Sequence, residues 1–219
     1  MLGRITWASN ATFLARVRTE GRELAVVYKP RAGERPLWDF PAGTLCLREV
    51  AAYRVSESLG WEIVPATTFR QGPLGEGMVQ RFVDHDPGRH YLVLRDLHPE
   101  RFRRFAAFDA VVNNADRKAG HCLEDPEGHV WGVDHGVTFH ADPKLRTVIW
   151  DFSGGPLDGE LAADLARLGA DLEGRLGSRL ARLLSGGELE ALRSRVEMLR
   201  LTGVLPAPGG RYPYPWPLV

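Results

Sequence analysis

The chain has 219 residues, and its 28 Lys and Arg residues balance 28 Asp and Glu residues, so the formal net charge is zero. A neutral chain has no global attraction to nucleic acid or to an acidic membrane, and we expect neither as a partner. Hydrophobic residues make up 44% of the chain and charged residues 26%, which is typical of a globular protein with a packed core. The length suits one domain or two closely packed lobes.

The chain contains only two cysteines, Cys46 and Cys122, which is too few for a disulfide framework. The first thirty residues contain no long apolar run of the kind found in a signal peptide or a membrane span. We therefore expect a cytoplasmic protein with reduced thiols. The oligomeric state is not indicated by any of these features.

The first half of the chain is predicted to contain four strands and one helix. The apolar run 24–28 is bounded by Gly21 and Pro30, as expected of a short strand. Thr44 precedes a helical pattern that Gly60 ends, so it is predicted to cap that helix. In chain order the expected elements are strands at 5–17 and 23–28, a helix at 44–59, and strands at 63–69 and 77–83.

The second half is predicted to be mainly helical. A helix is expected from Pro99 to about Asn113, because apolar residues recur there at helical spacing. Leucines repeat with the same period over 161–184 and 189–199, which predicts helices that face a core. Between these helices, the turn 124–129 separates two short apolar pieces and predicts a small hairpin.

The composition changes between residues 84 and 98, from a strand-rich to a helix-rich half. This predicts an α+β fold with an antiparallel-sheet lobe at 1–84 and a mainly helical lobe at 85–219. The tail 204–219 ends in alternating prolines, which cannot continue a helix. We expect an extended strap on the protein's own surface, with a polyproline ligand for a partner as the alternative.

Polar residues are concentrated in the segment 113–121, between an apolar helix and an apolar hairpin. Burying such a segment is costly unless its groups are used. Asp116, followed five residues later by His121, can place a base against a substrate hydroxyl and a coordinating atom on a metal. Taken alone, the segment is explained equally well as a solvated connection.

Two further features point to the same chemistry. Asp134 follows a short strand and precedes a glycine that can tighten a turn, so its carboxylate can complete a magnesium site. Lys29 ends an apolar strand, where its ammonium group needs a partner, and Glu49 on the next helix can supply one. Such an ion pair would direct Lys29 towards phosphate oxygens.

In this order the features resemble the protein-kinase-like superfamily over about residues 8–140. The resemblance is greater to its atypical branch, the phosphatidylinositol 3- and 4-kinase-like and HipA-like kinases. The strand lysine and helix glutamate of those families match Lys29 and Glu49, the Asn-x-Asp loop matches Asn114 and Asp116, and the Asp-x-Gly motif begins at Asp134. The chain is also similar, over nearly its whole length, to small bacterial phosphatidylinositol-kinase-like proteins.

The resemblance implies a nucleotide site that holds ATP and Mg²⁺. It gives Asp116 the role of orienting or deprotonating the acceptor, with Asn114 in the same catalytic loop. It makes Asp134 a metal ligand and the residue at position 121 the second one. Kinases normally carry asparagine there, whereas His121 offers nitrogen, which favours softer metals, so Mn²⁺ or a direct contact to phosphate is an alternative.

Two segments are expected to complete the nucleotide site. The small polar loop with Ser9, Asn10 and Thr12 can cradle phosphates, although it lacks the glycine repeats of protein kinases. The segment Gln80, Arg81, Phe82 and Val83 falls where the resemblance places the hinge that meets adenine, and a plain strand end explains it equally well.

The predicted function is an ATP-dependent phosphotransferase that acts on an unidentified small molecule or protein side chain. The alternative is a pseudokinase-like protein that binds ATP and regulates a partner, and a third interpretation is transfer of AMP. A structural zinc site built from Cys122 and the nearby histidines is disfavoured, because their spacing fits no standard ligand pattern.

Overall fold

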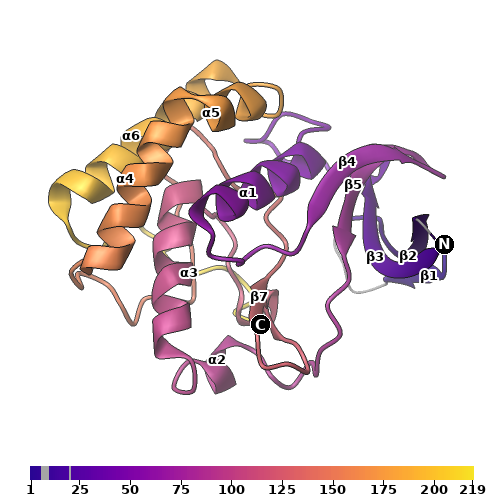
Figure 1. The fold of residues 1–219 in the computed structure, drawn as a ribbon, viewed down its shortest axis with the longest axis horizontal. Coiled ribbons are helices and arrows are strands. Elements are labelled where there is room, and N and C mark those ends of the chain that lie inside the picture. The colour runs from indigo at the N-terminus through magenta and orange to yellow at the C-terminus, as the bar shows by residue number, and fades with distance from the viewer. Residues whose placement is uncertain (6–9, 20) are drawn as a thin grey trace.

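The computed structural model describes residues 1–5, 10–19 and 21–219. Its N-terminal half is an antiparallel sheet of five strands in the order β1-β2-β3-β5-β4, with one helix, α1, beside it (Figure 1). The predicted strand, strand, helix, strand, strand order is confirmed except at the start, where two strands, β1 and β2, occur in place of the single strand expected at 5–17. The elements are β1 (Gly3–Ile5), β2 (Thr12–Thr19), β3 (Arg22–Pro30), α1 (Leu45–Leu59), β4 (Thr67–Gly72) and β5 (Gly75–Arg81), with a short 3-10 turn at Arg31–Gly33.

Helix α1 has the predicted length but a different N-terminal cap. Gly60 ends the helix in a left-handed conformation with φ of 69°, as glycine at this position does in many helices. The Thr44 side chain does not cap the first turn, because its hydroxyl donates to the Pro41 carbonyl at 2.7 Å. The Glu34 carboxylate replaces it and accepts from the Cys46 amide at 2.7 Å, where a negative charge also favours the helix dipole.

The strand predicted at 63–69 begins later than expected, at Thr67. Ile63 and Val64 are buried in the core instead. Their backbone amides donate to the Ser56 hydroxyl of α1 at 3.0 and 3.1 Å. The two amides therefore have a helix partner in place of a strand partner, and sheet pairing starts only beyond Pro65.

The C-terminal half is mainly helical, as predicted, and its core is formed by side chains of its helices together with those of α1. Phe102, Phe105 and Phe108 of the first long helix are fully buried. The predicted hairpin is present as β6 and β7. The elements are α2 (Tyr91–Leu94), α3 (Pro99–Val112), a 3-10 turn (Ala119–His121), β6 (Cys122–Glu124), β7 (Val130–Gly132), α4 (Gly159–Glu173), α5 (Arg175–Leu180) and α6 (Gly186–Thr202).

The tail runs back over the helical half and contacts it through main-chain groups. The Pro213 carbonyl accepts from the Thr147 amide at 3.2 Å, and the Leu218 carbonyl accepts from the Ala119 amide at 2.8 Å. The tail therefore lies on the protein's own surface as an extended strap. Its aromatic side chains do not form the contact, since Tyr212 and Trp216 are 66% and 87% exposed.

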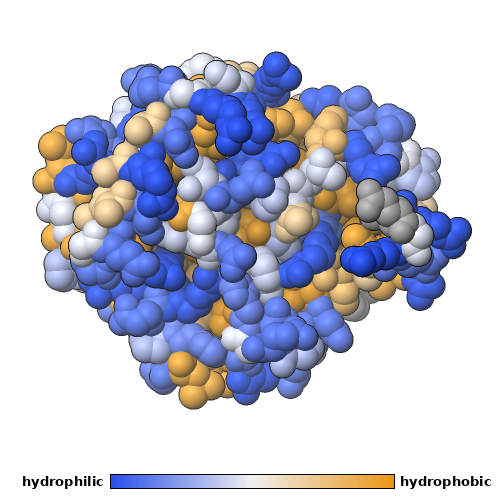
Figure 2. All heavy atoms as spheres, in the orientation of Figure 1, coloured by the Kyte–Doolittle hydropathy of each residue, from blue (hydrophilic) through white to orange (hydrophobic). Residues whose placement is uncertain are grey.

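On the face shown in Figure 2, polar and charged residues cover most of the surface, with apolar residues in small groups between them. Within the described residues, none of the helices combines the length and the apolar character needed to span a bilayer.

Candidate active site

Lys29 joins the two halves of the protein. It lies near the end of β3, where its Nζ is 2.5 Å from Oε1 of Glu49 on α1 and 2.8 Å from Oδ1 of Asp134 after β7. The Lys29 side chain is 16% exposed and the Glu49 side chain 2% exposed. The structure thus brings three of the predicted site residues together, although they come from three separate segments.

The charges of Lys29 and Asp134 stabilise each other, whereas burial and the Asp134 charge raise the pKa of Glu49. Burial alone would lower the pKa of Lys29, but the Asp134 and Glu49 carboxylates outweigh it and raise that pKa above its ordinary value. The Lys29 charge in turn lowers the pKa of Asp134. Lys29 and Asp134 are therefore both charged at neutral pH, and the carboxylate remains 47% exposed.

Asp134 is held in an uncommon backbone conformation. Its φ is 59°, in the left-handed region that non-glycine residues rarely occupy. The glycine of this turn, Gly136, does not take the positive φ, so the left-handed position falls on the acid itself. The turn is fixed from α1, where Glu49 Oε2 accepts from the His135 amide at 2.9 Å. Strain of this kind is common at binding and catalytic positions.

The polar segment 113–121 is built around Asp109 of α3, a residue that was not among the predicted site residues. Asp109 is fully buried, and its carboxylate accepts from the Arg117 guanidinium at 2.9 Å and from the Asn114 amide group at 3.0 Å. The segment is therefore an ordered loop and not a solvated connection. In the sequence, Asp109 could have been identified as an acidic residue among the phenylalanines of α3.

Asp116 is oriented by this loop. Asn114 Oδ1 accepts from the Asp116 amide at 3.0 Å, and Lys118 Nζ lies 3.4 Å from the Asp116 carboxylate. Burial raises the pKa of Asp116 to about 6, with Lys118 opposing the shift. A carboxyl group with a pKa near neutrality can exchange a proton with a hydroxyl group efficiently.

His121 faces Asp134, with Nε2 at 3.6 Å from Oδ2. Burial lowers the pKa of His121 to about 4, so the ring is neutral at pH 7. Its Nδ1 accepts from the Lys118 amide at 3.3 Å, which places the proton on Nε2. In that tautomer Nε2 carries the proton and can act only as a donor, and ligation of a metal by Nε2 would require the loss of the bond to Lys118.

The residues present therefore fit a magnesium ion only in part. Asp134 offers a hard oxygen ligand, and Mg²⁺ at phosphoryl-transfer sites is bound by one or two carboxylates together with substrate phosphates. His121 fits this role poorly, because of its tautomer and its nitrogen donor. In the described part of the chain, no group of three or more His, Cys, Asp or Glu side chains has a metal-binding arrangement.

The predicted phosphate loop is described only in part. Ser9 lies outside the described residues. The Asn10 side chain accepts from the Arg35 amide at 2.8 Å, and the Thr12 hydroxyl donates to the Asn10 carbonyl at 3.2 Å. The Thr12 side chain is thus engaged within the loop and the Asn10 side chain with the segment after β3, and their role in phosphate binding stays a prediction.

The predicted hinge segment begins within β5, to which Gln80 and Arg81 belong, and continues beyond it at the junction of the two halves. Gln80 is buried and donates to the Thr67 hydroxyl at 2.8 Å. The amides of Arg81 and Phe82 donate to the carbonyls of residues 66 and 25 at 2.9 and 3.0 Å. These three groups hold the sheet together, so the Gln80 side chain and the two amides are not available to a nucleotide. The Val83 amide follows them, outside the strand.

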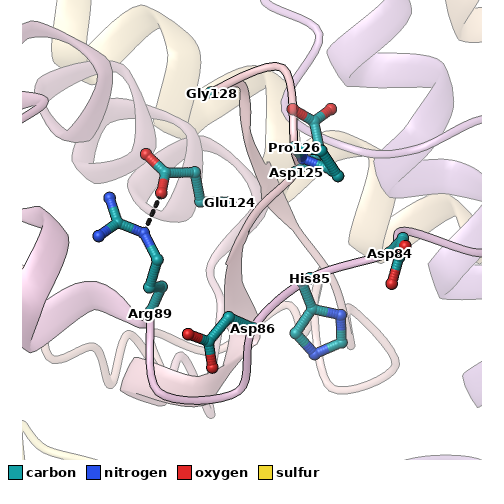
Figure 3. Close-up of a pocket in the computed structure, with 8 residues that line it drawn as sticks. All are labelled: Asp84, His85, Asp86, Arg89, Glu124, Asp125, Pro126 and Gly128. Atoms are coloured by element: carbon teal, nitrogen blue, oxygen red, sulfur yellow. Dashed lines mark hydrogen bonds and ion pairs between the residues drawn. The ribbon is translucent and has the colours of Figure 1, made fainter.

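A cavity of about 460 Å³ lies next to this segment and was not predicted (Figure 3). It is located between the linker 84–89 and the β6–β7 turn, and not around Lys29. Glu124 on its wall is paired with Arg89 and His98. The Asp125 carboxylate accepts from the Trp131 indole at 2.7 Å. The Glu124 and Asp125 carboxylates on the cavity wall therefore already have partners within the protein.

The fold is similar to the crystal structure of a Helicobacter pylori proinflammatory kinase, CtkA, with a TM-score of 0.56 and 13% sequence identity over 92% of this chain and 91% of that chain. The fold is therefore kinase-like, as the sequence predicted.

No family model matches the chain. In sequence it is 44% identical over 252 residues to Protein Rv2133c of Mycobacterium tuberculosis, a match that covers 99% of this chain and 91% of that protein. The chain belongs to the family of Protein Rv2133c.

Proposed function

We propose that this protein is an ATP-dependent phosphotransferase, an atypical kinase that acts on a small molecule or an exposed protein side chain. The observation that carries the proposal is the contact of Lys29 with both Glu49 and Asp134 at the junction of the sheet and the helical half. A buried cation paired in this way is a natural ligand for phosphate oxygens. The kinase-like fold supports the same interpretation.

In this proposal each residue has a separate role. Lys29 contacts phosphate oxygens of ATP, and Glu49 holds Lys29 in place. Asp134 would hold Mg²⁺, which would supply neutralisation of the charge on the phosphates. Asp116 orients the acceptor hydroxyl and takes its proton, a role that its pKa of about 6 suits. His121 Nε2–H donates to a phosphate oxygen, which its tautomer favours over metal ligation.

Adenine is placed beside the hinge segment, where the Val83 amide lies beyond the end of β5. We assign the protein to the atypical branch, with phosphatidylinositol-kinase-like and HipA-like kinases, on the order of its motifs. The boundary of the two lobes near residue 84 stays a prediction, and it falls three residues after β5 ends at Arg81.

A second function, ATP binding without turnover, is favoured by His121. A neutral histidine with its proton directed at Asp134 is an unusual second ligand for a hard metal ion. If His121 prevents metal binding, the site holds ATP and signals occupancy to a partner. Replacing His121 with Asn would then create turnover that the natural chain lacks.

The test is a comparison of binding and turnover with MgATP and MnATP. If the protein is a phosphotransferase, we expect it to bind ATP and to form ADP in the presence of an acceptor. We expect Asp116→Asn to lose turnover but to keep ATP binding. Labelled ATP identifies the group transferred, because γ-phosphate transfer releases ADP whereas AMP transfer releases pyrophosphate. Absence of nucleotide binding with either metal ion would contradict both functions.

A further inference from the structure

Arg48, the neighbour of Glu49 on α1, is almost fully buried, with 1% of its side chain exposed. Its guanidinium donates to the Thr138 carbonyl at 2.6 Å and forms an ion pair with Glu188 at the start of α6. The same group lies 4.8 Å from the centre of the Phe40 ring. Burial of a guanidinium is costly unless its donors are satisfied. Here its Nε donates to the Thr44 hydroxyl at 3.3 Å, and its two terminal nitrogens bond to the helical half of the protein.

The partners of Arg48 are themselves fixed. Glu188 belongs to the capping box of α6, in which its carboxylate accepts from the Ser185 amide at 2.8 Å. The Thr138 hydroxyl donates to the His135 carbonyl at 2.7 Å, so the carbonyl that Arg48 contacts lies in the turn that follows Asp134. Arg48 is therefore bonded both to a helix terminus and to the turn of the candidate active site.

Consecutive residues of α1 thus hold the same turn at two points. Glu49 accepts from the His135 amide, and Arg48 donates to the Thr138 carbonyl. Movement of α1 away from the helical half would break both contacts together. It would also withdraw Glu49 from Lys29, whose Nζ it contacts at 2.5 Å.

We propose that Arg48 is a positioning residue, which fixes α1 to the helical half and thereby keeps Lys29, Glu49 and Asp134 assembled without a bound ligand. The expected effect of Arg48 on catalysis rests on the proposed function. Its effect on the assembly of Lys29, Glu49 and Asp134 can be tested without a nucleotide. A site assembled in this way needs no activating partner or modification to bring Glu49 to Lys29.

A second set of contacts joins the N-terminal side of α1 to the helical half, which agrees with the positioning role of Arg48. The loop before α1 reaches the segment after Thr138, where Lys144 Nζ lies 2.8 Å from the Asp39 carboxylate. His140 in that segment contacts the Asp39 carbonyl at 3.0 Å. The N-terminal end of α1 and the turn after Asp134 are therefore joined by two sets of charged contacts.

The experiment uses a variant in which no charge is left unpaired. Arg48→Met with Glu188→Gln removes both charges, and glutamine can keep the capping box of α6. The matched control is Arg54→Met, on the same helix, where an arginine with 30% of its side chain exposed pairs with Glu57 at 3.0 Å. Thermal unfolding first establishes a temperature at which all proteins are folded.

The first measurement is the rate at which each lysine is acetylated by an amine reagent, followed by mass spectrometry without nucleotide. The chain has three lysines, Lys29, Lys118 and Lys144, so each is resolved. We expect Lys29 to be the slowest in the natural protein. In the double variant it should react about tenfold faster or more, since it loses contact with an opposite charge, while Lys118 stays unchanged. The control should leave Lys29 protected.

The second measurement separates positioning from stability. In the double variant kcat should fall by about tenfold or more with little change in KM for ATP, because aligned groups act mainly in the transition state. Arg48→Lys, which keeps the charge, should recover part of the loss, and Arg54→Met should keep the natural kcat. Protection of Lys29 equal to that of the natural protein in the folded double variant would overturn the proposal. If the natural protein binds no nucleotide, the proposed function fails, and the lysine rates still decide the role of Arg48.

Discussion

Lys29 Nζ lies 2.8 Å from Oδ1 of Asp134, although the two residues are 105 positions apart in the chain. One belongs to the sheet and the other follows β7 in the helical half, so the contact forms only when the two halves pack against each other. Glu49 is the third member, and its contact with the backbone of the Asp134 turn makes the cluster a single unit. The candidate site is thus a product of the packing between the halves.

Lys29→Met should destabilise the protein and remove nucleotide binding. The change leaves the Glu49 and Asp134 carboxylates close together without their cation, which costs about 3 kcal/mol. Urea denaturation measures the free energy of unfolding, and addition of Glu49→Gln should recover part of the loss. A free energy of unfolding unchanged in Lys29→Met would show that the cluster contributes nothing to stability.

Asp134→Asn and Asp134→Ala should differ in stability but not in function. Both lose the charge, and both should lose the thermal stabilisation by MgATP. Because asparagine tolerates the left-handed conformation better than alanine, the Asn variant should be more stable by about 1 kcal/mol. Equal stabilities in chemical denaturation would contradict the backbone strain assigned to Asp134.

Asp116→Asn should stabilise the protein at neutral pH while it removes turnover. Burial raises the pKa of Asp116 to about 6, so the folded state binds the proton more tightly than the unfolded chain. The carboxylate therefore costs stability as the pH rises from about 4 to about 6, and the cost stays constant above that range. Since the side chain is partly exposed, we expect a gain of only about 1 kcal/mol at pH 7, and none at pH 4.

The same shift predicts the pH dependence of turnover. If Asp116 acts as the base, kcat/KM should fall below about pH 6, as the carboxylate becomes protonated. Initial rates between pH 5 and pH 8 would show the change, with stability checked at each pH. A rate independent of pH over this range would exclude Asp116 as the group whose ionisation controls the reaction.

Asp109→Ala should be the most damaging of these substitutions. It leaves the buried Arg117 guanidinium without its carboxylate, which costs about 3–5 kcal/mol. Asp142→Ala is the matched control, because the Asp142 side chain is 82% exposed and its loss should change stability by less than about 0.5 kcal/mol. Similar unfolding midpoints for the two variants would contradict the central position of Asp109.

The sequence predicted the fold class and the cluster around Lys29 because both have local signals. An apolar strand that ends in a lysine, and an acid placed directly after a short strand, are visible without coordinates. Gly60 likewise ends α1 where predicted, since a left-handed helix end favours glycine. These features depend on residues close together in the chain.

The features that were missed depend on distant residues. Glu34 caps a helix that starts eleven positions later, which displaced Thr44 from its predicted role. Arg48 has the sequence environment of an exposed helical arginine, and its burial follows from contacts with Thr138 and Glu188. Nothing near them in the sequence distinguishes such residues from solvated ones.

The most direct test of the central claim is a crystal structure with a non-hydrolysable ATP analogue and Mn²⁺. We expect adenine between the sheet and the helical half beside Val83, with phosphate oxygens within hydrogen-bond distance of Lys29 Nζ and the metal ion on Asp134. An analogue bound away from Lys29, or a crystal with no nucleotide at saturating concentration, would contradict this expectation.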